Sequence, residues 1–149
     1  MATRKRGRIT VLLVDDEELD RRIASEILRS EGYTVLEAEN YTEAAALFNA
    51  NRKRITLLVA DISLPDGNGC SLAIALREQK TDLRVLFVSG HVGAEVCKYY
   101  GLEVGTLHFL RKPFSAADLA KRVGAVLAGI EPFPQLLTAK TFKSTGEVI

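Results

Sequence analysis

The stretch VLLVDDEEL, residues 11–19, joins an aliphatic run directly to four consecutive carboxylates, Asp15 to Glu18. A continuous run of Val and Leu is typical of a β-strand that is buried on both faces, as parallel strands are when helices cover the sheet. Carboxylates avoid such a core unless they are paired, so the acidic run marks the end of the strand. The sequence therefore places an acidic cluster at the carboxyl end of the first predicted strand.

Four further aliphatic runs follow, at residues 33–38, 55–60, 83–89 and 106–110. Segments with a helical apolar period lie between them and after the last. Asn40 and Ser115 precede two of these segments and are typical helix N-caps. Residues 91–105 contain three glycines and predict only a short helix. The residues predicted to form the buried helix faces are Leu19, Ile23, Ile27, Leu28, Ala44, Leu47, Phe48, Leu72, Ala75, Leu76, Leu119, Val123, Val126 and Leu127.

Strands and helices that alternate five times predict an α/β fold, a doubly wound five-stranded parallel sheet with helices on both faces. In such a sheet, ligands bind beyond the carboxyl ends of the strands, at the point where the strand order reverses. The acidic run after the first strand lies at such an end, and this makes it a candidate binding site.

Length and composition exclude several classes of protein. The 149 residues suffice for one domain with tails, and no apolar run approaches the roughly 18 residues of a membrane span. Residues 1–8 hold four basic side chains, and the remainder carries a net charge of −3, which argues against a nucleic-acid-binding surface. The N-terminus has no signal-peptide pattern, so we expect a cytoplasmic protein without membrane partners. Cys70 and Cys97 lack metal or disulfide spacing and are expected to be buried thiols.

Three aspartates are predicted to converge at the ends of neighbouring strands. Asp15 and Asp16 end the first strand, and Asp61 directly follows the third aliphatic run. Like charges this close raise one another's pKa, so a counter-charge is needed. Mg²⁺ prefers carboxylate and phosphate oxygens, which predicts a metal site that receives a phosphoryl group. Ser89 ends the fourth aliphatic run and Lys112 follows the fifth, where a hydroxyl and an ammonium could hold phosphate oxygens.

Together these motifs resemble the receiver domain of two-component response regulators, including the receivers of hybrid sensor histidine kinases. The matching stretches are VDD at 14–16, DISLPDGNG at 61–69, SG at 89–90 and KPF at 112–114. The resemblance implies the flavodoxin-like strand order 2-1-3-4-5. It divides the chain into a basic N-terminal arm (1–8), a receiver domain (9–128) and a C-terminal tail (129–149).

The resemblance also implies a role for each site residue. Asp61 would accept a phosphoryl group from the phosphohistidine of a histidine kinase or phosphotransfer domain. Asp16 and Asp61 would coordinate Mg²⁺ directly, Asp15 would do so through water, and the backbone carbonyl of Ser63 would complete the protein ligands. Ser89 and Lys112 would hold the phosphate, and the Lys112–Pro113 peptide would be cis. Such a chain is not a conventional enzyme, because it catalyses only its own phosphorylation and dephosphorylation.

In the family, phosphorylation switches a protein-interaction surface. Ser89 and Phe109 match the two switch positions, and the surface comprises the fourth helix, fifth strand and fifth helix. A homodimer through this face is one expected assembly. The segment GLEVGTLHFLRKPF, residues 101–114, resembles receivers fused to hybrid kinases, so a fused kinase and a separate output protein both stay open.

Two other functions compete with this interpretation. A receiver-like scaffold that is never phosphorylated would usually lack an acidic or lysine position, and none is missing here. A haloacid-dehalogenase-like phosphatase would carry a second Asp two residues after the nucleophile, where this chain has Ser63. Asp66 belongs to a Pro-Asp-Gly turn and is expected to shape that turn rather than to bind metal.

Overall fold

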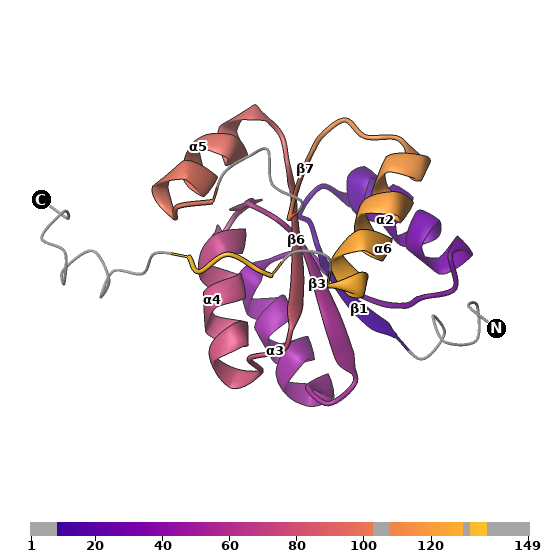
Figure 1. Cartoon of the computed structure of the whole chain (residues 1–149), viewed down its shortest axis with the longest axis horizontal. Coiled ribbons are helices and arrows are strands. Elements are labelled where there is room, and N and C mark those ends of the chain that lie inside the picture. The colour runs from indigo at the N-terminus through magenta and orange to yellow at the C-terminus, as the bar shows by residue number, and fades with distance from the viewer. Residues whose placement is uncertain (1–8, 103–107, 130–131, 137–149) are drawn as a thin grey trace, which may run out of the picture.

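The computed structural model describes residues 9–102, 108–129 and 132–136, and it contains a central sheet of five parallel strands (Figure 1). From edge to edge these are β2 (Thr34–Ala38), β1 (Thr10–Val14), β3 (Ile55–Asp61), β6 (Arg84–Ser89) and β7 (Phe109–Arg111). This order confirms the predicted 2-1-3-4-5, because β4 (Ser63–Leu64) and β5 (Gly67–Asn68) form a separate two-stranded hairpin. The strand order reverses between β1 and β3, and Asp15, Asp16 and Asp61 lie at the carboxyl ends of these two strands.

Helices cover both faces of the sheet, as expected from the aliphatic strands (Figure 1). One face carries α2 (Glu18–Ser30) and α6 (Ala116–Ala128). The other carries α3 (Tyr41–Asn51), α4 (Gly69–Gln79) and α5 (His91–Tyr99). Successive strand residues serve the two layers in turn, so Leu12 and Val14 pack on the α3 side while Val11 and Leu13 pack on the α2 side.

The helix boundaries follow local capping chemistry. The Asn40 side chain accepts a hydrogen bond from the backbone of Glu43, which confirms the predicted N-cap of α3. Ser115 and Asp118 form a reciprocal capping box at the start of α6. At its other end α6 stops at Gly129, whose left-handed φ of 67° turns the chain away from the helix.

The predicted buried face of the first helix is partly wrong. Leu28 is buried as expected, but Leu19 is 69% exposed and Ile23 is 47% exposed. The residues that α2 buries beside Leu28 are Ala24 and Ser25. The apolar period identified the helix correctly, but the position of the sheet and of α6 decides which side of it is covered.

Past α6, residues 132–136 lie on the α4 side of the sheet, opposite to the side that α6 covers (Figure 1). Leu136 is only 7% exposed and belongs to the core there. Both thiols, of Cys70 and Cys97, are buried and unpaired by any disulfide, as expected. Among the described helices, none combines the length and the apolar character that crossing a bilayer requires.

Candidate metal centre

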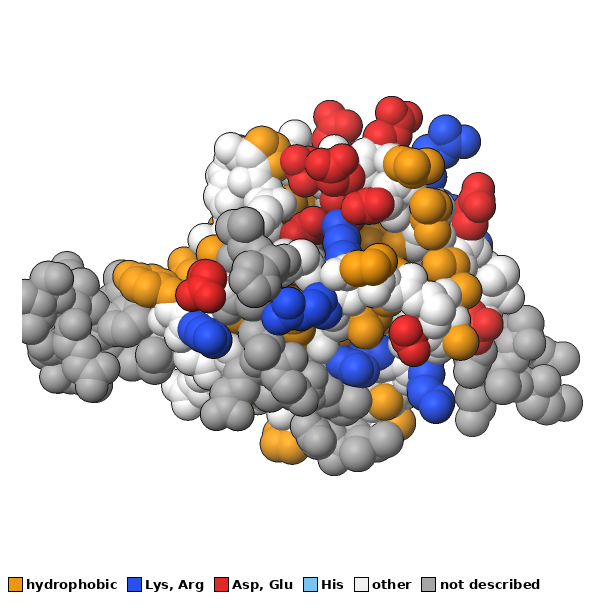
Figure 2. All heavy atoms as spheres, turned by 90° about the horizontal axis from the view of Figure 1, so that it is seen from above, with side chains coloured by type: hydrophobic (Ala, Val, Ile, Leu, Met, Phe, Trp, Pro, Cys, Tyr) orange, Lys and Arg blue, Asp and Glu red, His pale blue; other side chains and the backbone are white. Residues whose placement is uncertain are grey.

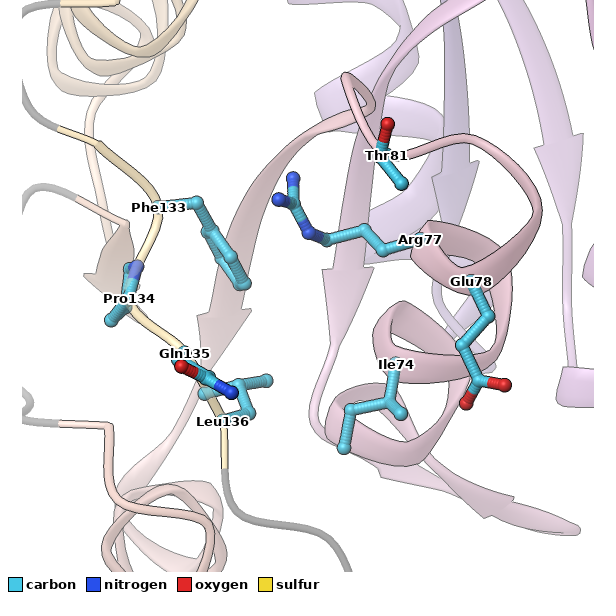
Figure 3. A pocket seen from close by; sticks show the side chains of 8 residues that line it. All are labelled: Ile74, Arg77, Glu78, Thr81, Phe133, Pro134, Gln135 and Leu136. Atoms are coloured by element: carbon cyan, nitrogen blue, oxygen red, sulfur yellow. The ribbon is translucent and has the colours of Figure 1, made fainter.

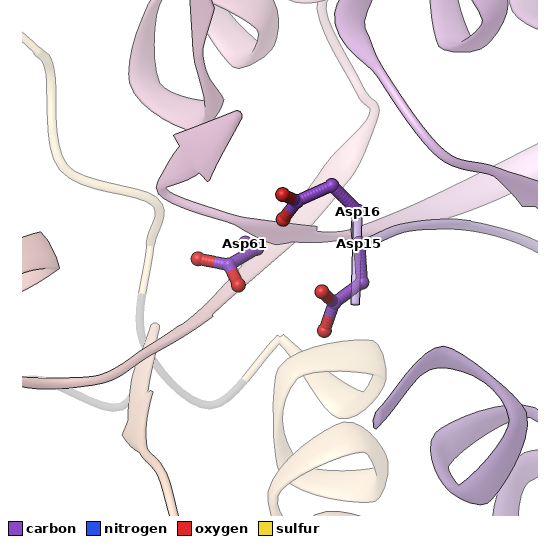
Figure 4. A group of neighbouring side chains, drawn as sticks. All are labelled: Asp15, Asp16 and Asp61. Atoms are coloured by element: carbon purple, nitrogen blue, oxygen red, sulfur yellow. The ribbon is translucent and has the colours of Figure 1, made fainter. Parts of the chain in front are cut away.

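Three carboxylates meet at the carboxyl ends of β1 and β3, as the sequence predicts (Figure 4). Asp15 and Asp16 follow β1, and Asp61 is the last residue of β3. One oxygen from each carboxylate lies within 4.8 Å of the others. Asp15 and Asp61 are buried, whereas Asp16 is exposed to solvent. The register pairs Val14 with Ala60, so the residues that follow these two are brought side by side.

Lys112 supplies the counter-charge that this cluster requires. Its Nζ lies 2.7 Å from Asp15 Oδ2 and 2.9 Å from Asp61 Oδ2. Burial alone would lower the pKa of Lys112, but the hydrogen bonds to Asp15 and Asp61 outweigh it and hold the pKa above its ordinary range. Burial raises the pKa of Asp15, and the bond from Lys112 offsets this only in part. The ammonium is therefore firmly charged and is bound between the two buried acids.

Among the three clustered aspartates, Asp61 accepts the most hydrogen bonds. Its Oδ1 accepts from the Ser89 hydroxyl at 3.1 Å and from the Ser63 backbone N–H at 3.0 Å, and its Oδ2 faces Lys112. Ser89 ends β6 and is fully buried, and Lys112 follows β7. Each predicted strand end thus contributes the predicted group.

The predicted residues share one open cleft of about 390 Å³, whose lining includes Asp16, Asp61, Ser63, Ser89 and Lys112. Asp15 is buried, does not line this cleft, and is bound to Lys112. Figure 2 views the molecule from above, onto this end of the sheet, where acidic side chains gather with basic ones beside them. Carboxylates, a backbone carbonyl and room for water are the donor set that Mg²⁺ prefers, so these residues fit such an ion.

Phe109 is not part of this cleft. It lies in β7 opposite Phe87 of β6, is buried, and packs in the core on the α4 side. The Lys112–Pro113 peptide is cis, as the resemblance implies.

Two glycines hold the site together, and the sequence interpretation gave neither of them a role. A Cβ on Gly69 would lie 2.4 Å from the backbone oxygen of Asp61, so only glycine lets α4 begin this close to β3. A Cβ on Gly93 would lie 1.9 Å from Ser89 Oγ. Gly69 could have been found in the quoted loop at 61–69, whereas Gly93 was seen only as a sign of a weak helix.

A third carboxylate contacts Lys112 that the sequence did not single out. Asp20 Oδ2, in the first turn of α2, lies 3.1 Å from Lys112 Nζ. Arg21, beside it in the chain, donates to the backbone oxygen of Asp15 at 2.8 Å. The start of α2 is therefore bound to the site through two side chains.

Asp66 has a structural task, as its turn sequence indicates. Its carboxylate accepts from the backbone N–H groups of Tyr41 and Thr42 and from the Thr42 hydroxyl. These bonds lower the pKa of Asp66 and join the β4–β5 hairpin to the first turn of α3.

Comparisons with known proteins agree with this geometry. The sequence model of the response regulator receiver domain matches residues 11–124. The aerobic respiration control protein ArcA of Escherichia coli is 36% identical over 118 residues, which are 79% of this chain and 48% of ArcA. The sensor kinase CckA of Brucella abortus is 34% identical over 126 residues, 85% of this chain and 13% of that kinase. The chain thus spans about half of one curated relative and a small part of the other.

Among solved structures, the non-phosphorylated HemR receiver domain from Leptospira biflexa superposes with a TM-score of 0.68 at 33% identity. The match covers 84% of this chain and 98% of that domain. A family model that matches most of the chain and a relative domain that is matched almost completely lead to one conclusion: this chain belongs to the response regulator receiver domain family, whose members act in phosphorelay signal transduction.

Proposed function

We propose that Asp61 is the phospho-acceptor of this receiver and takes its phosphoryl group from the phosphohistidine of a histidine kinase or phosphotransfer domain. The observation that carries this is the position of Asp61, which lines the open cleft and at the same time contacts Lys112 and Ser89. An Asp61 carboxylate oxygen attacks phosphorus, the O–P bond forms, and the N–P bond breaks. The histidine nitrogen keeps the electron pair of that bond and is free to take a proton.

In this proposal Mg²⁺ is held by the carboxylates of Asp16 and Asp61, by Asp15 through water and by the backbone carbonyl of Ser63. When bound, the metal supplies neutralisation of the charge on the phosphoryl oxygens. The protein's own contribution is positioning. The Lys112 ammonium already contacts Asp61 and can move to bind a phosphoryl oxygen instead. The Ser89 hydroxyl can donate a hydrogen bond to a second phosphoryl oxygen.

The donor has a suitable surface beside the cleft. Leu19 and Ile23 of α2 are exposed although they are apolar, and Ile23 lines a hollow of about 420 Å³ with Lys112 and Phe114. A donor helix with an apolar face could cover these side chains and bring its phosphohistidine over the neighbouring acidic site. Their exposure, which contradicts the predicted helix face, supports this part of the proposal.

The output is proposed to be a protein contact. A phosphate on Asp61 would draw the Ser89 side chain towards itself and change the space in which Phe109 packs. This would shift the relative populations of two conformations of the face formed by α5, β7 and α6. The same face could form a homodimer. The relatives of this chain include both a sensor kinase and a transcriptional regulatory protein.

Two alternatives from the sequence have no support. The family match and the fold are those of receivers rather than of haloacid-dehalogenase-like phosphatases. The hypothesis of a receiver-like scaffold that is never phosphorylated has no support either, because the structure brings the acidic residues and Lys112 together.

The test is incubation of the chain with Mg²⁺ and acetyl phosphate, followed by intact mass measurement. We expect wild type to gain one phosphate, and Asp61→Asn to gain none. Asp82→Asn makes the same change of charge just before β6, at the opposite end of that strand, and should be labelled like wild type. Stoichiometric labelling of Asp61→Asn would refute the assignment.

A further inference from the structure

The segment Pro132–Leu136 occupies a groove that belongs to other elements. The preceding helix, α6, packs on the α2 side of the sheet, yet Leu136 is buried in the core on the α4 side. Residues 132–136 therefore lie beside α4, on the face of the sheet opposite to the one that α6 covers (Figure 1). A segment that only linked two parts of a protein would not need to reach that core.

Phe133 is the first of two anchors. Its ring centre lies 6.1 Å from that of Phe87 in β6 and 5.1 Å from that of His108, which precedes β7. The Arg77 guanidinium of α4 lies 4.8 Å from the centre of the same ring. Aromatic pairs and a cation over a ring face are specific contacts, so this socket selects an aromatic side chain.

Leu136, three residues later, is the second anchor. It packs in the core cluster that contains Phe87 and Phe109. Pro134 disfavours helical backbone for Phe133 before it, and in the polyproline II conformation that this leaves open, with about three residues per turn, side chains three positions apart lie on the same side. The groove therefore accepts an extended peptide with an aromatic residue and an aliphatic residue at this spacing.

The segment is held by these side chains rather than by its backbone. Within the described part of the chain, no backbone–backbone hydrogen bond joins residues 132–136 to other residues. A cavity of about 480 Å³ also remains between the segment and α4, lined by Ile74, Arg77 and Thr81 (Figure 3). A segment without backbone hydrogen bonds, beside unfilled space, can leave at low cost compared with a core helix or strand.

We propose that the groove between α4 and the β6–β7 pair is a docking site for a short extended peptide of the pattern aromatic-x-x-aliphatic. The chain's own Phe133 and Leu136 are its resident occupant, and a partner protein's segment of the same chemistry replaces them. The groove reaches Phe87, two residues before Ser89 in the same strand, so an occupant of this site touches the strand that ends at the cleft. The proposal concerns peptide binding and does not depend on phosphorylation.

The test uses the full chain with Phe133→Ala and Leu136→Ala combined, which empties the groove. A fluorescein-labelled peptide with the sequence of residues 132–136 is titrated and its anisotropy is measured. We expect saturable binding to the double variant and at least tenfold weaker binding to wild type, because the tethered segment competes at a high effective concentration. Adding Arg77→Ala to the double variant should weaken binding, whereas adding Arg22→Ala, on the exposed side of α2, should not.

A peptide with alanine at both anchor positions is the matched ligand control and should not bind. Equal binding to wild type and to the folded double variant, or none to either, would overturn the proposal. If circular dichroism shows that the double variant is unfolded, Phe133→Trp decides instead, because the chain contains no other tryptophan. The peptide should then shift the emission of the single tryptophan to longer wavelength as it is displaced into water, and an unchanged spectrum at millimolar peptide contradicts the proposal.

Discussion

Single atoms decide whether this site can form at all. Gly93 gives Ser89 its place, since any side chain on residue 93 would occupy the position of the Ser89 hydroxyl. Lys112 lies between Asp15 and Asp61, whose side chains are only 3% and 8% exposed, and its ammonium is the positive charge that faces both buried carboxyl groups. Both effects are direct contacts between neighbouring atoms.

Replacing glycines tests the first of these effects. Gly93→Ala should destabilise the protein by about 1–3 kcal/mol, the usual range for overpacking, and should reduce labelling by acetyl phosphate. Gly124→Ala is the matched control, because Gly124 lies inside α6 with nothing within 4 Å of the added Cβ. It should stabilise α6 by about 0.5–1 kcal/mol and leave labelling unchanged. Urea unfolding measures both, and equal behaviour of the two variants would contradict the close contact with Ser89.

Replacing Lys112 by Met tests the second effect, the positive charge that Lys112 places between Asp15 and Asp61. Without the ammonium, the buried carboxylates repel each other, so Lys112→Met should lose on the order of 3 kcal/mol of unfolding free energy in EDTA. Mg²⁺ can serve as the counter-charge instead. The gain in melting temperature on adding Mg²⁺ should therefore be larger for the variant than for wild type, and a smaller gain would argue against a metal at these acids.

At the scale of elements, short connections hold the loops of the cleft in place. The β4–β5 hairpin carries Ser63 into the cleft, and Asp66 fastens this hairpin to the start of α3. Ionised Asp66 accepts a hydrogen bond from the backbone N–H of Thr42, which is the largest cause of its lowered pKa, and a second one from the backbone N–H of Tyr41. These bonds keep the pKa of Asp66 below the ordinary value of 3.8. The arrangement of the hairpin thus depends on the charge of one side chain.

This connection has a defined pH dependence. A carboxyl whose pKa is lower in the folded state adds stability above its unfolded pKa, and the contribution disappears as the pH falls through the folded value. Asp66→Ala should therefore be less stable than wild type at pH 7, and the difference should shrink below about pH 3.8. Acid and urea unfolding of the two proteins measure this. Glu26→Ala, an exposed residue of α2, is the control, and a difference that persists unchanged at pH 2.5 would contradict the prediction.

At the scale of the whole molecule, the cleft and the groove beside α4 share one strand. Ser89 ends β6 at the cleft, and Phe87 of the same strand supports Phe133. Their side chains point to the same face of the sheet because they are two residues apart. A shift of Ser89 towards a phosphate can therefore reach Phe133 through one strand.

The coupling can be measured with the Phe133→Trp variant. Beryllofluoride with Mg²⁺, which imitates an aspartyl phosphate, should change its tryptophan emission. The same addition should have no effect when Asp61→Asn is also present. An identical response in both proteins would show that the signal does not come from the Asp61 site.

The sequence by itself determined the sheet, its strand order through the family resemblance, and the meeting of Asp15, Asp16, Asp61, Ser89 and Lys112. This was possible because neighbouring parallel strands end at the same edge, so residues that follow aliphatic runs must come together. The apolar periods of strands and helices are local patterns, so they can be recognised in the sequence without knowledge of the packing.

Only the tertiary structure decided which helix faces are covered and which distant residues touch. Leu19 and Ile23 follow a helical period but lie outside the contact between α2 and the sheet. The approach of Gly93 to Ser89, the bond from Asp66 to Thr42 and the return of Phe133 to β6 depend on distances between whole elements. A periodic pattern does not encode such distances, because they are set by how side chains from several elements fill one shared volume.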